Sequence, residues 1–191
     1  MAQYMKLVSP SHEHLASCMA ALRRGWSMTG GAEAAEEELG EIEDNSSLFL
    51  ARKEDREALS APITLPDGSS VPRLPGFHRW LWDGGFCGTI SFRWQPGTTE
   101  LPPHCLGHIG YAVVPWKQGL GYATEALRQM LPEAMALGMP FIEVTTDPTN
   151  TASQKVIERN GGVLFETFIK PIQFGSKPGL RYRIYLSHGS A

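Results

Sequence analysis

Residues His108 to Thr124 read HIGYAVVPWKQGLGYAT, and the rest of the chain can be understood from this segment. An apolar strand pattern enters this stretch, Gly119 and Gly121 interrupt it, and a helical pattern follows from Tyr122. Glycines directly before a helix leave its first backbone amides unobstructed, and these amides attract anions together with the positive end of the helix. The stretch therefore predicts an anion cradle, most economically for the pyrophosphate of a large cofactor.

The composition is typical of one globular domain over residues 1–191. Hydrophobic residues make up 42% of the chain, charged residues 19%, and the formal net charge is -3. This balance gives no reason to expect nucleic acid or an anionic membrane as a partner. Cys18, Cys87 and Cys105 are odd in number and lack Cys-x-x-Cys spacing, so they indicate neither a disulfide framework nor a zinc site. With no signal-peptide pattern and no membrane-spanning run, we expect a cytoplasmic protein.

The first half of the chain alternates short strands with helices. The patterns predict a strand at 4–8, helices at 12–24 and 32–42, a brief strand at 48–51, and a hairpin of strands at 77–82 and 86–94. Residues 53–76 follow neither period, so we interpret them as a loop insertion and a candidate lid. Pro66 to Gly68 indicates a turn inside that insertion, between small strands at 63–65 and 71.

The second half returns to strand and helix alternation. We expect strands at 106–114, 141–146, 163–169 and 180–186, with helices at 122–137 and 151–160. Pro132 is expected to kink or shorten the first of these helices. The order of elements predicts an α/β or α+β mixed fold with a sheet of about six or seven strands.

Two familiar phosphate sites do not fit the cradle. A P-loop needs a Lys directly after its last glycine, and no Lys follows Gly119 or Gly121. A dinucleotide fingerprint needs a third glycine where Thr124 stands, and it needs the glycines to follow the strand directly. A nicotinamide or nucleotide enzyme is therefore disfavoured.

The remaining match is the run Gln118-Gly119-Leu120-Gly121-Tyr122-Ala123, which has the form Gln/Arg-x-x-Gly-x-Gly/Ala. It resembles the acetyl-CoA signature of the GNAT superfamily of N-acetyltransferases. A buried strand at 141–146 and a helix opened by Asn150-x-x-Ser153 follow where that family has them, so the resemblance covers about residues 106–168. It implies a mostly antiparallel mixed sheet flanked by about four helices.

The resemblance also implies how acetyl-CoA is held. The backbone of one strand would pair with the pantetheine arm, the cradle amides would bind the pyrophosphate, and an asparagine would contact the arm or the acetyl region. In this chain the implied cofactor residues are Tyr111, Ala112, Val113, Val114, Gln118, Gly119, Leu120, Gly121, Tyr122, Ala123, Thr124 and Asn150.

Catalysis needs a neutral amine and a proton for the departing thiolate. Glu143 and His108 are the candidates for general base, beside ordered water or no discrete base. Many members of that family carry a proton-donating Tyr seven residues after the asparagine, but this chain has Ile157 there. Ser153, Tyr122 or water would then supply the proton, or the chemistry would run without a dedicated acid.

We therefore expect an acetyl-CoA-dependent N-acetyltransferase that acts on a primary amine of a small molecule or peptide, directly and in a ternary complex. The alternative is a non-catalytic acyl-CoA-binding module of the same fold. His104, Cys105 and His108 form no convincing metal cluster, so no metal is expected. A homodimer would be common among such relatives.

Overall fold

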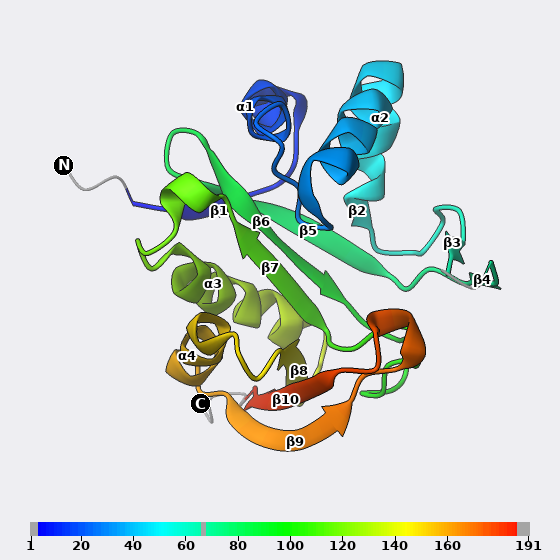
Figure 1. Ribbon diagram of the computed structural model, residues 1–191, viewed down its shortest axis with the longest axis vertical. Coiled ribbons are helices and arrows are strands. Elements are labelled where there is room, and N and C mark those ends of the chain that lie inside the picture. Colours follow the sequence, from blue (N-terminus) through cyan, green and yellow to red (C-terminus); the bar gives the residue numbers. More distant parts are fainter. Residues whose placement is uncertain (1–3, 66–67, 187–191) are drawn as a thin grey trace.

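The computed structural model describes residues 4–65 and 68–186 of the chain (Figure 1). Within these ranges the helices are α1 (His12–Leu22), α2 (Gly31–Arg52), α3 (Tyr122–Ala136) and α4 (Thr151–Arg159), with 3-10 turns η1 (Pro115–Lys117) and η2 (Ile172–Phe174). The strands are β1 (Lys6–Val8), β2 (Glu54–Asp55), β3 (Ile63–Thr64), β4 (Ser70–Val71), β5 (Gly76–Trp82), β6 (Phe86–Arg93), β7 (Ile109–Val113), β8 (Phe141–Thr146), β9 (Val163–Ile169) and β10 (Pro178–Tyr185).

The longer strands form two sheets. The N-terminal sheet has the order β1-β5-β6-β7, with β2 beside β5, and the C-terminal sheet has the order β8-β10-β9. Every described strand pair is antiparallel. The prediction of a mixed α/β fold with four helices and mostly antiparallel strands is confirmed. The strands form two sheets where one was expected, and a gap separates β7 from β8.

Two apolar cores hold the layers together. Figure 1 shows α1 and α2 on one face of the N-terminal sheet and α3 on the other, beside the C-terminal sheet. The main core joins α3 to both sheets through side chains such as Ile90, Leu127 and Ile142, all fully buried. The second core packs α1 and α2 on the opposite face, around Trp80 and Phe86. The β7–β8 gap is therefore flanked by rigid layers.

The predicted strand at 48–51 was wrong, because these residues form the last turn of α2. Ala35, Ile42 and Phe49 are buried at intervals of seven residues and continue one helical face. Asn45 has non-helical backbone angles, and its side-chain oxygen accepts the backbone N–H of Leu48 at 2.9 Å. This internal cap restarts the helix after a kink. In the sequence, an asparagine followed by two serines is typical of a helix end, so the continuation of α2 was not expected.

Two other expectations concern proline-containing segments. Pro132 does not shorten its helix, because α3 continues to Ala136. In the insertion, Ile63–Thr64 pairs with Ser70–Val71 as the predicted small hairpin. Its turn at Pro66 to Gly68 lies partly outside the described residues.

Candidate functional site

The glycine loop that is expected to form the cradle lies directly before α3. Gly121 precedes the helix with φ +79°, and Gly119 has φ +77°, a backbone conformation that residues with a Cβ rarely adopt. Neither glycine would place a Cβ within 4 Å of another group, so the space above the loop is open. The side-chain amide of Gln118 donates to the Val113 carbonyl at 3.2 Å and ties the loop to the end of β7.

A cavity of about 620 Å³ opens above the cradle and reaches the start of α4. Three basic side chains line it and are suited to phosphate groups: Lys117, Lys155 and Arg159. The cavity brings together nearly all of the predicted cofactor residues: Tyr111, Ala112, Val113, Gln118, Gly119, Gly121, Tyr122, Ala123, Thr124 and Asn150.

Two predicted cofactor residues do not line this cavity. Val114 is fully buried, and its backbone N–H donates to the Cys87 carbonyl at 3.0 Å. The Val114 N–H therefore faces β6 and not the free edge of β7. Leu120 is 57% exposed and is absent from the cavity lining, although it stands between Gly119 and Gly121.

A second cavity of about 300 Å³ occupies the gap between β7 and β8. Tyr111, Asn150 and Ser153 line both cavities, so the cradle leads into the gap. The Tyr111 hydroxyl lies 2.9 Å from the Ser153 hydroxyl, and burial raises the pKa of Tyr111. A protonated phenol, hydrogen-bonded to a serine, therefore faces the place where the two cavities meet.

The side chain of Asn150 caps α4, because its oxygen accepts the Ser153 backbone N–H at 3.0 Å. Ile157 is fully buried in the main core. The position at which the resemblance to the GNAT superfamily implied a tyrosine therefore offers no proton donor to the gap.

A family model, the acetyltransferase (GNAT) domain, matches residues 49–163. The chain belongs to the GNAT acetyltransferase family. Because it belongs to this family, the protein is an acyltransferase. Among curated protein sequences none matches the chain.

Solved structures of acetyltransferases share the GNAT fold at low sequence identity. The ribosomal-protein α-N-acetyltransferase RimL, solved with coenzyme A, is 13% identical with a TM-score of 0.60, over 97% of this chain and 96% of RimL. A chimera of the spermidine N-acetyltransferase from Vibrio cholerae is 12% identical with a TM-score of 0.59, over 97% of each chain. The microcin C7 self-immunity acetyltransferase MccE, solved with acetyl-CoA and AMP, is 13% identical with a TM-score of 0.58, over 95% and 92%. Such identities show the fold alone.

His108 of this GNAT protein joins the two sheets at the closed end of the gap. Its backbone N–H donates to the Glu143 carbonyl at 2.8 Å, and its ring Nδ1 accepts the Glu143 N–H at 3.0 Å. The side chain is fully buried, and burial lowers the pKa of His108 to about 4. The lone pair that a base needs is thus already engaged, so this geometry does not support His108, one of the two candidates for general base, in that role.

The Glu143 side chain lies on the face of β8 opposite the buried Ile142 and Val144. One carboxylate oxygen accepts a hydrogen bond from Arg183 at 2.7 Å, and the other lies 3.5 Å from Arg181. The side chain lines neither the cradle cavity nor the gap. Strand alternation alone could not tell which face of β8 meets the substrate.

Asp83 anchors the cradle from the turn between β5 and β6. Its buried carboxylate accepts hydrogen bonds from Lys117 at 2.6 Å and from the Tyr122 hydroxyl at 2.7 Å. Burial alone would raise the pKa of Asp83, but these two bonds hold it below its usual value. The bond between Asp83 and Tyr122 raises the pKa of Tyr122 to about 12. Tyr122 is therefore a fixed support of the cradle and not the expected acid.

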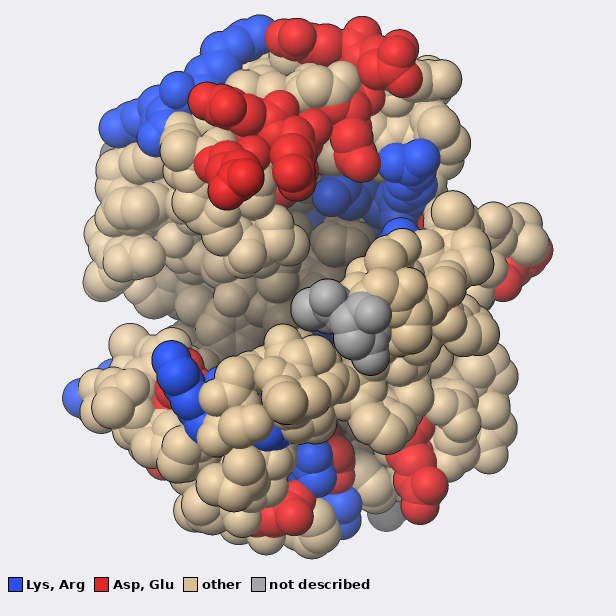
Figure 2. Space-filling view, turned by 45° about the vertical axis from the view of Figure 1, so that its right-hand side comes forward, with Lys and Arg blue, Asp and Glu red and all other residues tan. Residues whose placement is uncertain are grey.

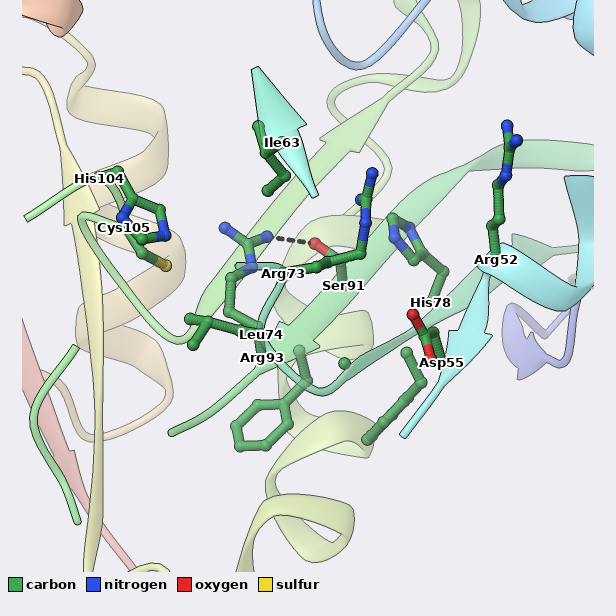
Figure 3. A pocket seen from close by; sticks show the side chains of 13 residues that line it. Arg52, Asp55, Ile63, Arg73, Leu74, His78, Ser91, Arg93, His104 and Cys105 are labelled. Atoms are coloured by element: carbon green, nitrogen blue, oxygen red, sulfur yellow. Dashed lines mark hydrogen bonds between the residues drawn. The ribbon is translucent and has the colours of Figure 1, made fainter. Parts of the chain in front are cut away.

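A third cavity, of about 270 Å³, lies over β5 and β6 (Figure 3). This cavity was not predicted from the sequence. It is rich in basic and hydroxyl side chains: Arg52, Arg73, His78, Ser91, Arg93 and His104. One signal was available, because polar Thr89, Ser91 and Arg93 alternate with core residues along β6. Figure 2 shows a hollow below the acidic top of the molecule, where α2 lies, with basic side chains at its edge.

Among the described residues, no group of three or more His, Cys, Asp or Glu side chains is arranged to hold a metal ion. In the same part of the chain, no helix is long and apolar enough to cross a membrane.

Proposed function

We propose that this protein transfers the acetyl group of acetyl-CoA to a primary amine, directly and in a complex that holds both substrates. The observation that supports this best is the common border of the cradle cavity and the gap, formed by Tyr111, Asn150 and Ser153. A cofactor whose pyrophosphate rests on the cradle can extend along β7 and present its thioester in the gap.

The cradle amides at 118–124 and the basic side chains of Lys117, Lys155 and Arg159 are proposed to bind the phosphates. The backbone of Tyr111–Val113 is proposed to pair with the pantetheine arm as an added strand. In the described structure β7 pairs with β6 only, which leaves its other edge available for such pairing.

In the reaction, the amine nitrogen attacks the thioester carbonyl and the carbon–sulfur bond breaks. The Tyr111 hydroxyl gives its proton to the departing thiolate, and Ser153, 2.9 Å away, orients that hydroxyl. The amine loses its proton to water, because the basic atoms of Glu143 and His108 are engaged elsewhere. Solvent then restores the proton to Tyr111.

The second candidate is an acyl-CoA-binding module without catalysis. Buried Ile157 favours it, because the usual proton donor is missing. An assay of free CoA thiol release from acetyl-CoA, with a panel of primary amines, separates the two. Release that saturates with the amine supports the enzyme. Binding of acetyl-CoA with no release above the rate in the absence of amine would establish the module.

We also propose a homodimer and a cytoplasmic location. The edge strand β9 exposes apolar side chains, including Phe165 at 53% and Ile169 at 66%, which supports contact with a second copy. The three cysteines are free, as in a reducing compartment.

A further inference from the structure

The third cavity carries an excess of positive charge. Among the described residues, no carboxylate lies within ion-pair distance of Arg93 or Arg73. Asp55 is the single carboxylate that lines the cavity, and its oxygens already accept the backbone N–H groups of Leu59 at 2.8 Å and Ser60 at 2.9 Å. Arg73 Nε donates to the Ala61 carbonyl at 3.0 Å, and the charge of Arg73 helps to lower the pKa of Asp55. Arg93 is therefore the guanidinium of this cavity with the least compensated charge among the described residues.

Other groups in the cavity are consistent with a missing anion. His104 Nε2 is buried and has no hydrogen-bond partner among the described residues, a costly state that an oxyanion would relieve. Burial, with the positive charges of Lys53 and Arg93, lowers the pKa of His78 well below its usual value. In Figure 3, Arg93 is hydrogen-bonded to Ser91, with the side chains of Arg73 and His78 beside this pair.

Arg93 connects this cavity to the gap between the sheets. Its Nη2 donates to the Ser91 hydroxyl at 2.6 Å, and that hydroxyl donates to the Gly110 carbonyl at 3.3 Å. A Cβ on Gly110 would lie 3.3 Å from Arg93 Nη2, so glycine lets the guanidinium rest against β7. Gly110 itself lines the gap. The positive charge thus borders the place where the proposed function puts the thioester.

We infer that this cavity binds an oxyanion of the acetyl acceptor, a carboxylate or a phosphate, with Arg93 as its main ligand. This rests on the proposed function and names the substrate class: an amine that also carries an anionic group. Arg73 and His104 complete the site. Polyamines carry only positive charge. We expect them to be poor acceptors, because the arginine side chains of this cavity repel them.

Matched acceptors test the inference. We expect kcat/KM for O-phosphoethanolamine or β-alanine to exceed that for ethanolamine or propylamine by about tenfold or more, with spermidine at the level of the neutral amines. The faster of the two anionic acceptors shows whether the site prefers a phosphate or a carboxylate. Arg93→Met should remove the advantage and Arg93→Lys should keep part of it, while Arg23→Met, at an exposed arginine of the α1 end, should change neither.

The inference is overturned if neutral and anionic amines react equally well, or if Arg93→Met slows both alike. A binding measurement separates this failure from failure of the proposed function. Calorimetric titration of O-phosphoethanolamine and β-alanine into the CoA-saturated protein should show that at least one of them binds, with affinity lost in Arg93→Met, even if no acetyl is transferred. Absence of binding by both to the CoA-saturated wild-type protein would contradict the anion site.

Discussion

Tyr111 is the residue at which cofactor binding and chemistry meet in the proposed reaction. Its backbone belongs to the strand edge, and its hydroxyl contacts Ser153 where the two cavities join. We predict that Tyr111→Phe lowers kcat by about 100-fold, because it removes the proton donor. Binding of acetyl-CoA, measured by calorimetry, should change little, since the ring is retained. Full activity of Tyr111→Phe, with Ser153→Ala inactive, would instead assign the proton to Ser153.

His108 should make stability depend on pH. Burial lowers its pKa to about 4, whereas the pKa of an unfolded histidine is about 6.5. The unfolded chain therefore binds the proton first, so the contribution of neutral His108 is complete above about pH 6.5 and is lost as the pH falls towards 4.

The variant His108→Asn isolates this contribution, because the Asn oxygen can still accept the Glu143 N–H. Between pH 7 and pH 5 we predict that the wild-type protein loses about 2 kcal/mol more free energy of unfolding than the variant does. Urea denaturation at the two pH values measures the difference. Equal losses would show that His108 is not held neutral. Buried His78 is present in both proteins and cancels.

At the scale of elements, Asp83 links the β5–β6 turn to η1 and to the start of α3. We predict that Asp83→Asn raises the KM for acetyl-CoA by about tenfold, because Lys117 loses its partner and the cradle is less well ordered. The KM for the amine should not change. A variant that was only destabilised would be expected to alter both KM values. Steady-state kinetics at saturating levels of the other substrate provide both values. An unchanged KM for acetyl-CoA would mean that the cradle holds its shape without Asp83.

Most elements, and the glycine loop before α3, were predictable because their information is local. The glycines before Tyr122 and the period of the following helix lie within one short stretch. The turn of α2 that contains Phe49 was not, because the helix leaves helical geometry at Asn45 and restarts with the Asn45 side chain as its cap. The position of the Glu143 side chain, paired with Arg183 and close to Arg181, depends on the register between β8 and β10, which the local pattern does not encode.

The roles of Asp83 and Arg93 could not be predicted either. Asp83 reaches Lys117 across 34 positions, and Arg93 meets Gly110 on the neighbouring strand. Contacts of this kind arise from strand order, which the local pattern does not encode.

At the scale of the whole molecule, the apolar edge of β9 predicts a dimer. Analytical ultracentrifugation should find a dimer of the wild-type protein and a monomer of Ile169→Lys, because a charge there would be buried between copies. Leu59→Lys is the matched control: Leu59 is 81% exposed on the insertion, away from the C-terminal sheet. Wild-type monomers, or equal dissociation of both variants, would contradict this interface.

Binding of the acetyl-CoA pyrophosphate by the cradle can be measured by calorimetric titration with matched glycine variants. Gly121 has φ +79° and Gly161 has φ +81°, and a Cβ added at either would meet no other group within 4 Å, so alanine strains both backbones alike. Only Gly121→Ala places a methyl group in the cradle. We predict saturable binding of acetyl-CoA to the wild-type protein and to Gly161→Ala, and binding about tenfold weaker to Gly121→Ala. Saturable binding of NADH without binding of acetyl-CoA, or equal affinities in the two variants, would contradict this role of the cradle.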